Sequence, residues 1–80
     1  MEYLVNEIVQ TGSPAGDARV FKTLPEAFQF IRKRNKESKI LIGESETTLE
    51  ELAIILNEWL ATVTLSLEND PGRKLVITAF

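Results

Sequence analysis

Residues 47–60 read TTLEELAIILNEWL, and this stretch predicts the helix around which the rest of the fold is arranged. Thr47 precedes Glu50 by three residues, which is the spacing of a capping box. Thr48 and Glu51 repeat that spacing one position later. In a capping box the hydroxyl and the carboxyl group satisfy backbone N–H groups that the first helical turn leaves without partners. We therefore expect a helix to begin at these threonines.

The apolar residues of this stretch cover most of the circumference of the predicted helix. Residues 49, 52, 53, 56 and 60 recur at the spacing of one helical face. Ile55 and Trp59 widen that face, and we expect Trp59 to lie in the core. Ile54 lies nearly opposite the centre of the face. A helix that is apolar on most sides is usually buried on more than one side, so either the rest of the chain or another chain is expected to cover it.

The composition is typical of one small globular domain, which we expect to span residues 1–80. The chain has 44 % apolar and 26 % charged residues, as in ordinary soluble proteins. Its apolar runs are far shorter than the ~20 residues that cross a membrane, and residues 1–10 do not resemble a secretory signal. We therefore expect a cytoplasmic protein with no membrane contact. The net charge of −3 argues against a surface that binds nucleic acid as a whole.

The first half of the chain predicts two strands and a helix. Residues 3–10 favour a strand because they are rich in β-branched and aromatic residues, and a short helix capped by glycine is the alternative. Residues 11–17 predict a loop, and residues 18–22 a short partner strand. A helix then begins at Thr23 or Leu24, has proline in its first turn, and ends in the basic residues 32–36. Its expected buried face comprises Leu24, Ala27, Phe28 and Ile31.

The second half predicts three strands and the helix described above. Residues 39–43, KILIG, contain three consecutive apolar residues, which favours a strand that is covered on both faces and central in its sheet. Residues 43–46 lead to the helix. From residue 62 the apolar period changes to two, and the alternating segments flank the turn sequence NDPG at 69–72. These segments predict a hairpin.

The predicted fold is therefore an α+β two-layer sandwich. Two helices cover one face of a mostly antiparallel sheet of four to five strands. The expected order of elements is β-β-α-β-α-β-β.

The chain contains no histidine and no cysteine. This excludes histidine acid–base catalysis, histidine-dependent serine and cysteine nucleophiles, and the usual zinc sites. An enzyme built on carboxylates alone needs a cleft between two of them, which a domain of this size rarely provides. We therefore predict no enzyme activity and no catalytic, cofactor-binding or metal-binding residues. A small carboxylate-based enzyme is the least favoured alternative.

Two further stretches have ordinary structural explanations. Glutamates at positions 44, 46, 50 and 51 complement the positive end of the second helix, and their spacing is not that of a calcium loop. Residues 12–16, GSPAG, lack the lysine and the glycine spacing of a phosphate-binding loop, and they predict a turn.

Residues 32–39, RKRNKESK, form a basic patch that contains five of the nine basic residues: Arg32, Lys33, Arg34, Lys36 and Lys39. These cations could bind the phosphates of a nucleic acid, with Phe30 offering its ring to a base. The alternative is structural, because cations complement the negative end of a helix and keep a small domain soluble. The cations of the patch also fan around the helix instead of lining one face.

Phe30 and Ile54 lie away from the centres of their helical core faces. Such residues on adjacent elements can form an interaction surface, and the alternative is that a loop or the N-terminal strand covers them. The predicted function is a non-enzymatic protein–protein interaction or regulatory module, such as an adaptor, an antitoxin-like protein or an inhibitor, that acts through an exposed apolar and acidic surface. The predicted partner-binding residues are Phe30, Ile54, Glu50, Glu51 and Glu58.

The predicted partner is another protein, or a second copy of the chain in a homodimer. Nucleic-acid binding through residues 32–39 is the alternative function.

Overall fold

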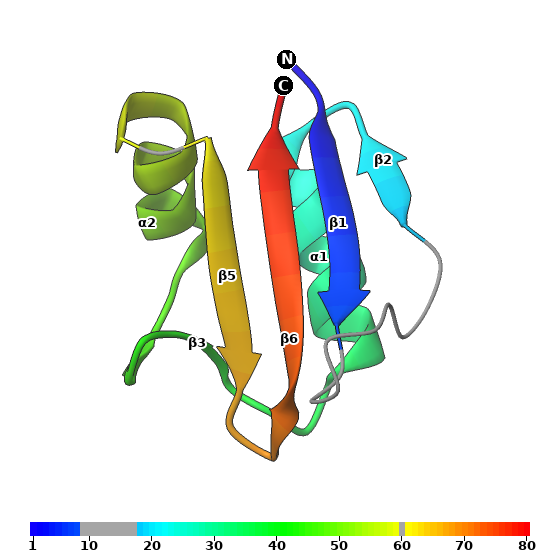
Figure 1. The fold of residues 1–80 in the computed structure, drawn as a ribbon, viewed down its shortest axis with the longest axis vertical. Helices are drawn as coiled ribbons and strands as arrows, with labels where there is room; N and C mark the ends of the chain where they lie inside the picture. Colours follow the sequence, from blue (N-terminus) through cyan, green and yellow to red (C-terminus); the bar gives the residue numbers. More distant parts are fainter. Residues whose placement is uncertain (9–17, 60) are drawn as a thin grey trace.

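The computed structural model describes residues 1–8, 18–59 and 61–80, and it has two layers, an antiparallel sheet and helices on one face of that sheet (Figure 1). The first half of the chain comprises β1 (Tyr3–Ile8), β2 (Arg19–Phe21), α1 (Leu24–Arg34) and β3 (Ile40–Ile42). The second half comprises β4 (Ser45–Glu46), α2 (Leu49–Ile54), the π-helical segment η1 (Ile55–Trp59), β5 (Thr62–Leu67) and β6 (Asp70–Ala79). The predicted α+β arrangement of two helices on an antiparallel sheet is confirmed. The predicted loop at 11–17, with its GSPAG turn at 12–16, lies outside the described residues.

The strands lie in the order β2-β1-β6-β5-β3-β4, and every neighbouring pair is antiparallel. The sheet has six strands and not the predicted four to five, because Ser45 and Glu46 pair with β3 and form β4. Gly43, at a φ of 64°, opens the two-residue turn between these strands, as glycine does in a type II′ hairpin. The element order is therefore β-β-α-β-β-α-β-β, with the π-helical segment following the second helix, and it differs from the prediction.

The prediction that residues 39–43 form a central strand is wrong. β3 lies second from one edge, and of its three residues Ile40 is buried while Leu41 and Ile42 are half-buried. β6 lies at the centre of the sheet, where it pairs with β1 on one side and with β5, its hairpin partner, on the other. β5 and β6 are the two alternating segments after residue 62, and they form the predicted hairpin.

The turn of this hairpin is displaced from the predicted residues 69–72. Leu67 pairs with Asp70, so the tight turn is Glu68-Asn69, and the register then shifts before Ser66 pairs with Lys74. The turn is anchored to the segment between α1 and β3, because the backbone N–H of Asn69 donates to the Ser38 hydroxyl at 3.0 Å. The Asn69 side-chain amide also donates to the backbone carbonyl of Glu37. These bonds hold the end of α1 against the end of the hairpin.

α1 follows the prediction closely. The Thr23 hydroxyl caps it by accepting from the backbone N–H of Glu26 at 3.4 Å, and proline stands in the first turn. Its buried residues are the predicted Leu24, Ala27, Phe28 and Ile31. The helix ends at Arg34, after which the Asn35 side-chain amide donates to the carbonyl of Ile31 at 2.8 Å. The side chain of Asn35 thus satisfies one of the carbonyl groups that a helix end leaves without a partner.

The second helix begins as predicted, but the described chain covers only its inner side. Thr48 caps it by accepting from the backbone N–H of Glu51 at 3.2 Å. Leu52 and Leu56 face the core, whereas Ile54 and Trp59 are 50 % and 76 % exposed. The prediction that Trp59 lies in the core is therefore wrong. The error arises because the chain is π-helical from Ile55 to Trp59, and the wider i→i+5 turn points these side chains in other directions than an α-helix would.

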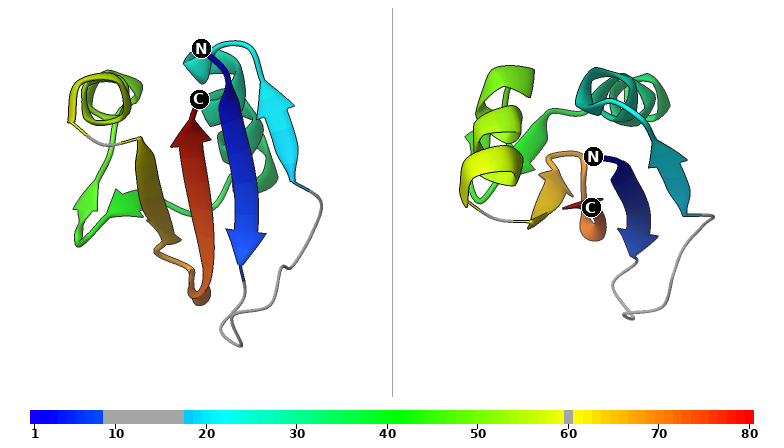
Figure 2. Two further views of the ribbon diagram at one scale, coloured as in Figure 1. Left: turned by 45° about the horizontal axis from the view of Figure 1, so that its top comes forward. Right: turned by 90° about the horizontal axis from the view of Figure 1, so that it is seen from above.

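Both helices lie on the same side of a curved sheet, and the other face of the sheet is left uncovered by them (Figure 2). The core between the layers contains Tyr3 and Val5 of β1 together with the alternate apolar residues of β5 and β6. Antiparallel sheets commonly have one packed and one solvated face. Among the described residues, no helix is long and apolar enough to cross a membrane.

Candidate functional site

The exposed side of α2 and η1 carries two large apolar side chains, Ile54 and Trp59. Residues five apart come close to one another along the axis of a π-helical turn, so Trp59 lies one turn beyond Ile54. Leu56 of the same segment is 4 % exposed and faces the core. The Tyr3 hydroxyl donates to Oδ1 of Asn57 at 3.1 Å and ties the segment to β1. The π-helical segment is thus held on its inner side while Trp59 stands in solvent.

Carboxylates accompany these apolar residues. Glu50, Glu51 and Glu58 are all exposed on α2 and η1. Glu50 lies four residues before Ile54, which places the two side chains on the same side of the α-helical part. The result is an apolar pair with acidic neighbours, and we call Ile54, Trp59, Glu50, Glu51 and Glu58 the α2–η1 surface. Four of these residues were predicted from the sequence, and Trp59 was not.

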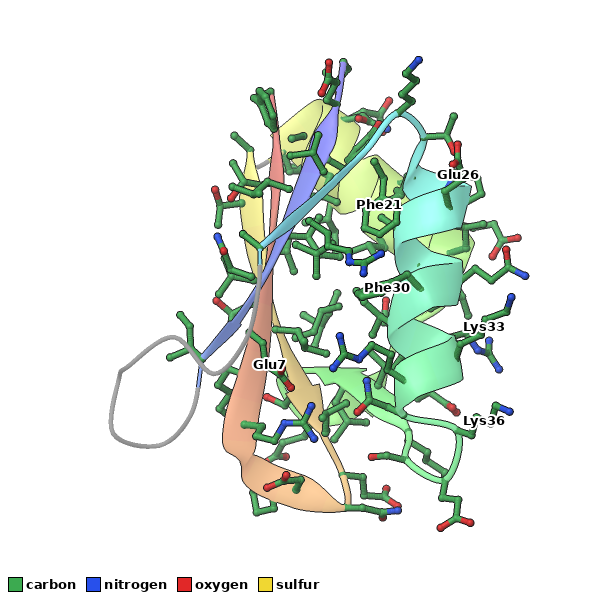
Figure 3. The ribbon with its side chains drawn as sticks, turned by 90° about the vertical axis from the view of Figure 1, so that its right-hand side faces the viewer. Glu7, Phe21, Glu26, Phe30, Lys33 and Lys36 are labelled. Carbon is green, nitrogen blue, oxygen red and sulfur yellow. The ribbon has the colours of Figure 1, made fainter. Side chains whose placement is uncertain are left out.

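Phe30, the fifth predicted partner-binding residue, does not belong to this surface. Its ring is half-buried and lies 5.2 Å from the ring of Phe21, centroid to centroid, at an interplanar angle of 44°. Figure 3 shows both rings pointing into the space between α1 and the sheet. Of the two alternatives for Phe30, the structure therefore favours the covered one, because the short strand β2 brings Phe21 over its ring. Ile54, in contrast, is half exposed.

The basic residues of the patch at 32–39 are all exposed, and they surround the end of α1. Two surface hollows lie here. The larger, of about 420 Å³, is lined by residues 33–38 together with Leu67, Asn69, Asp70 and Arg73 of the β5–β6 hairpin. The smaller, of about 300 Å³, is lined by Gln29, Arg32, Lys33, Asn35, Lys36 and Ser38. Lys39 lines neither hollow, and Arg73 joins the cations of the patch from a distant part of the sequence.

Three arginines beside these hollows are held by neighbouring side chains. The Arg34 guanidinium carbon lies 5.4 Å from the centre of the Phe30 ring, and that of Arg32 lies 5.8 Å from the centre of the Phe28 ring. These are cation–π distances. Arg73 forms an ion pair with Glu7, whose side chain is 13 % exposed, and lies 3.6 Å from a carboxylate oxygen of Asp70. Arg19 also lies over Phe30, at 5.2 Å, on the β2 side.

The glutamates at positions 44, 46, 50 and 51 are exposed in the structure, and Glu51 takes part in the cap of α2. No three acidic side chains among residues 1–8, 18–59 and 61–80 come together in a group that could hold a metal ion. Glu37 and Asp70 both border the larger hollow.

Comparison of this chain with protein-family models, with curated protein sequences and with solved structures finds no match.

Proposed function

We propose that this protein is a non-enzymatic protein-interaction or regulatory module that binds its partner through the α2–η1 surface. The observation that carries the proposal is the position of Trp59. Its side chain is 76 % exposed and follows the half-exposed Ile54 by five residues, on a π-helical turn whose buried residue Leu56 is packed in the core. Tryptophan is the residue most enriched among the side chains that dominate binding energy at interfaces. π-helical turns also occur frequently at functional sites.

The charges of this surface indicate the chemistry of the partner. Because Glu50, Glu51 and Glu58 lie around the apolar pair, the complementary surface is apolar at its centre and basic at its rim. A separate protein with such a surface is the proposed partner. A second copy of this chain is the less favoured candidate, because a symmetric homodimer through this surface would bring its glutamates close to the same glutamates of the other copy.

Site-specific photo-crosslinking in the native host tests this proposal. A photoreactive residue at position 58 is expected to capture one discrete protein, whose mass distinguishes another protein from a second copy. The Ile54→Asp substitution in the same chain should abolish the crosslink, while circular dichroism shows an unchanged fold because Ile54 is half exposed. A photoreactive residue at the exposed Lys22 provides the matched control. Equal capture from positions 58 and 22, or capture that survives Ile54→Asp, would refute the proposal.

A further inference from the structure

The two hollows at the end of α1 share one wall, and cations line both of them. Lys33, Asn35, Lys36 and Ser38 border the larger and the smaller hollow alike. The smaller hollow adds Arg32, and no carboxylate lines it. The larger adds Arg34 and Arg73 together with two carboxylates, of which Asp70 is the ion-pair partner of Arg73. Two anionic groups could therefore bind next to each other, one on each side of the Lys33–Lys36 wall.

The arginines on either side of this wall are preorganised for oxyanions. Arg32 is placed over Phe28 and Arg34 over Phe30. Arg73 is already paired with Glu7 and Asp70 and is not counted among the phosphate-binding groups. A guanidinium that stacks on a ring through its face keeps the N–H groups of its edge available for hydrogen bonds to phosphate oxygens. Holding these side chains before a ligand arrives lowers the entropy lost on binding. The phenylalanines thus position arginines.

We propose that the two hollows form one binding site for the phosphate backbone of a single-stranded nucleic acid. The strand crosses the Lys33–Lys36 wall, with one phosphate beside Arg32 and another, further along the strand, beside Arg34. A single strand can bend over such a wall, whereas a duplex is stiff over ~150 base pairs. Binding at this site rests on phosphate contacts, because the Phe30 ring packs against Phe21 and no stacking of a base is assigned to it.

Fluorescence anisotropy with a labelled thymidine oligonucleotide of about 12 nucleotides, titrated at about 50 mM salt and above, tests this inference. The Lys33→Gln/Lys36→Gln variant removes two exposed cations from the shared wall. It should weaken binding by at least about tenfold and reduce the slope of log affinity against log salt by about 1.4, since each single-strand phosphate contact contributes about 0.7. The Arg19→Gln/Lys22→Gln variant removes the same charge from exposed residues outside the hollows and the basic patch, and it should change the affinity by less than about twofold.

A second pair of measurements separates phosphate recognition from attraction to any anion. The Arg32→Lys/Arg34→Lys variant keeps the charge but loses the planar guanidinium groups, and it should also bind more weakly than the wild type. Unlabelled oligonucleotide should displace the labelled strand at a lower phosphate concentration than sodium tripolyphosphate does, and a glutamate peptide of equal charge should not displace it.

Four results would overturn the inference. They are absence of binding at about 50 mM salt, equal losses in the two glutamine variants, displacement by the glutamate peptide, and stronger displacement by tripolyphosphate. The last would mark the hollows as a site for a small polyphosphate. Circular dichroism of each variant shows whether a loss of binding reflects unfolding, which is not expected for these exposed side chains.

Discussion

Truncation to alanine should destabilise the fold strongly at Leu56 and hardly at all at Trp59, although both are large apolar residues of the same π-helical segment. Leu56 is 4 % exposed and lies among the core residues, whereas Trp59 is 76 % exposed. Replacement of a buried leucine by alanine costs about 2–5 kcal/mol, because apolar contacts are lost and a cavity remains. Replacement of an exposed side chain usually changes stability by no more than about 0.5 kcal/mol. The structure therefore predicts that the smaller residue is the more important one for stability.

Urea unfolding followed by far-ultraviolet circular dichroism measures both effects. Intrinsic fluorescence cannot serve here, because Trp59 is the only tryptophan in the chain. For a domain of this size each 1 kcal/mol shifts the melting temperature by about 4–8 °C, so Leu56→Ala should melt at least about 8 °C below the wild type and Trp59→Ala within about 4 °C of it. A cost of about 2 kcal/mol or more for Trp59→Ala would show that the indole is packed in the core. The direction of the π-helical segment, and with it the α2–η1 surface, would then be wrong.

Substitutions at three other positions, Thr48, Phe30 and Glu7, test the packing of the fold by the same unfolding assay. Thr48→Ala should cost about 1 kcal/mol because α2 loses the hydroxyl that accepts from Glu51, whereas Thr48→Asp should restore the cap; equal losses in both would contradict the capping role. Phe30→Ala should cost about 1–3 kcal/mol and Phe30→Leu clearly less, since Phe30 packs on Phe21, and a neutral Phe30→Ala would show an exposed ring. Glu7→Gln should cost about 1–3 kcal/mol because it leaves Arg73 without its mostly buried partner, and a loss no larger than that of the exposed Glu44→Gln would contradict the pairing.

Local signals in the sequence were sufficient where an element is long and its apolar period is regular. α1 has a threonine cap, an early proline and four apolar residues on one face, and all three features appear in the structure. The hairpin of β5 and β6 was equally clear from its alternation of apolar and polar residues. β4 was missed because two polar residues carry no apolar period, and its formation depends on the turn at Gly43.

The candidate sites were predicted less completely, because they depend on contacts between distant residues. The position of Phe30 is decided by Phe21 of β2, and Arg73 reaches the basic hollow only through the register of the β5–β6 hairpin. Trp59 was assigned to the core because its position was judged by the period of an α-helix, which the π-helical segment does not follow. The exposure of Ile54 could be predicted because this residue lies within the regular α-helical part.

The most direct test of the proposed interaction surface is acrylamide quenching of the single tryptophan over a series of protein concentrations, with light scattering to give the mass at each one. We expect Trp59 in the monomer to be quenched almost as readily as free tryptophan in water, because 76 % of the residue is exposed. Shielding that appears only as the mass doubles would identify a second copy as the partner. An indole that is shielded from acrylamide in the monomer would contradict the proposed interaction surface, because the α2–η1 surface would then lack its central residue.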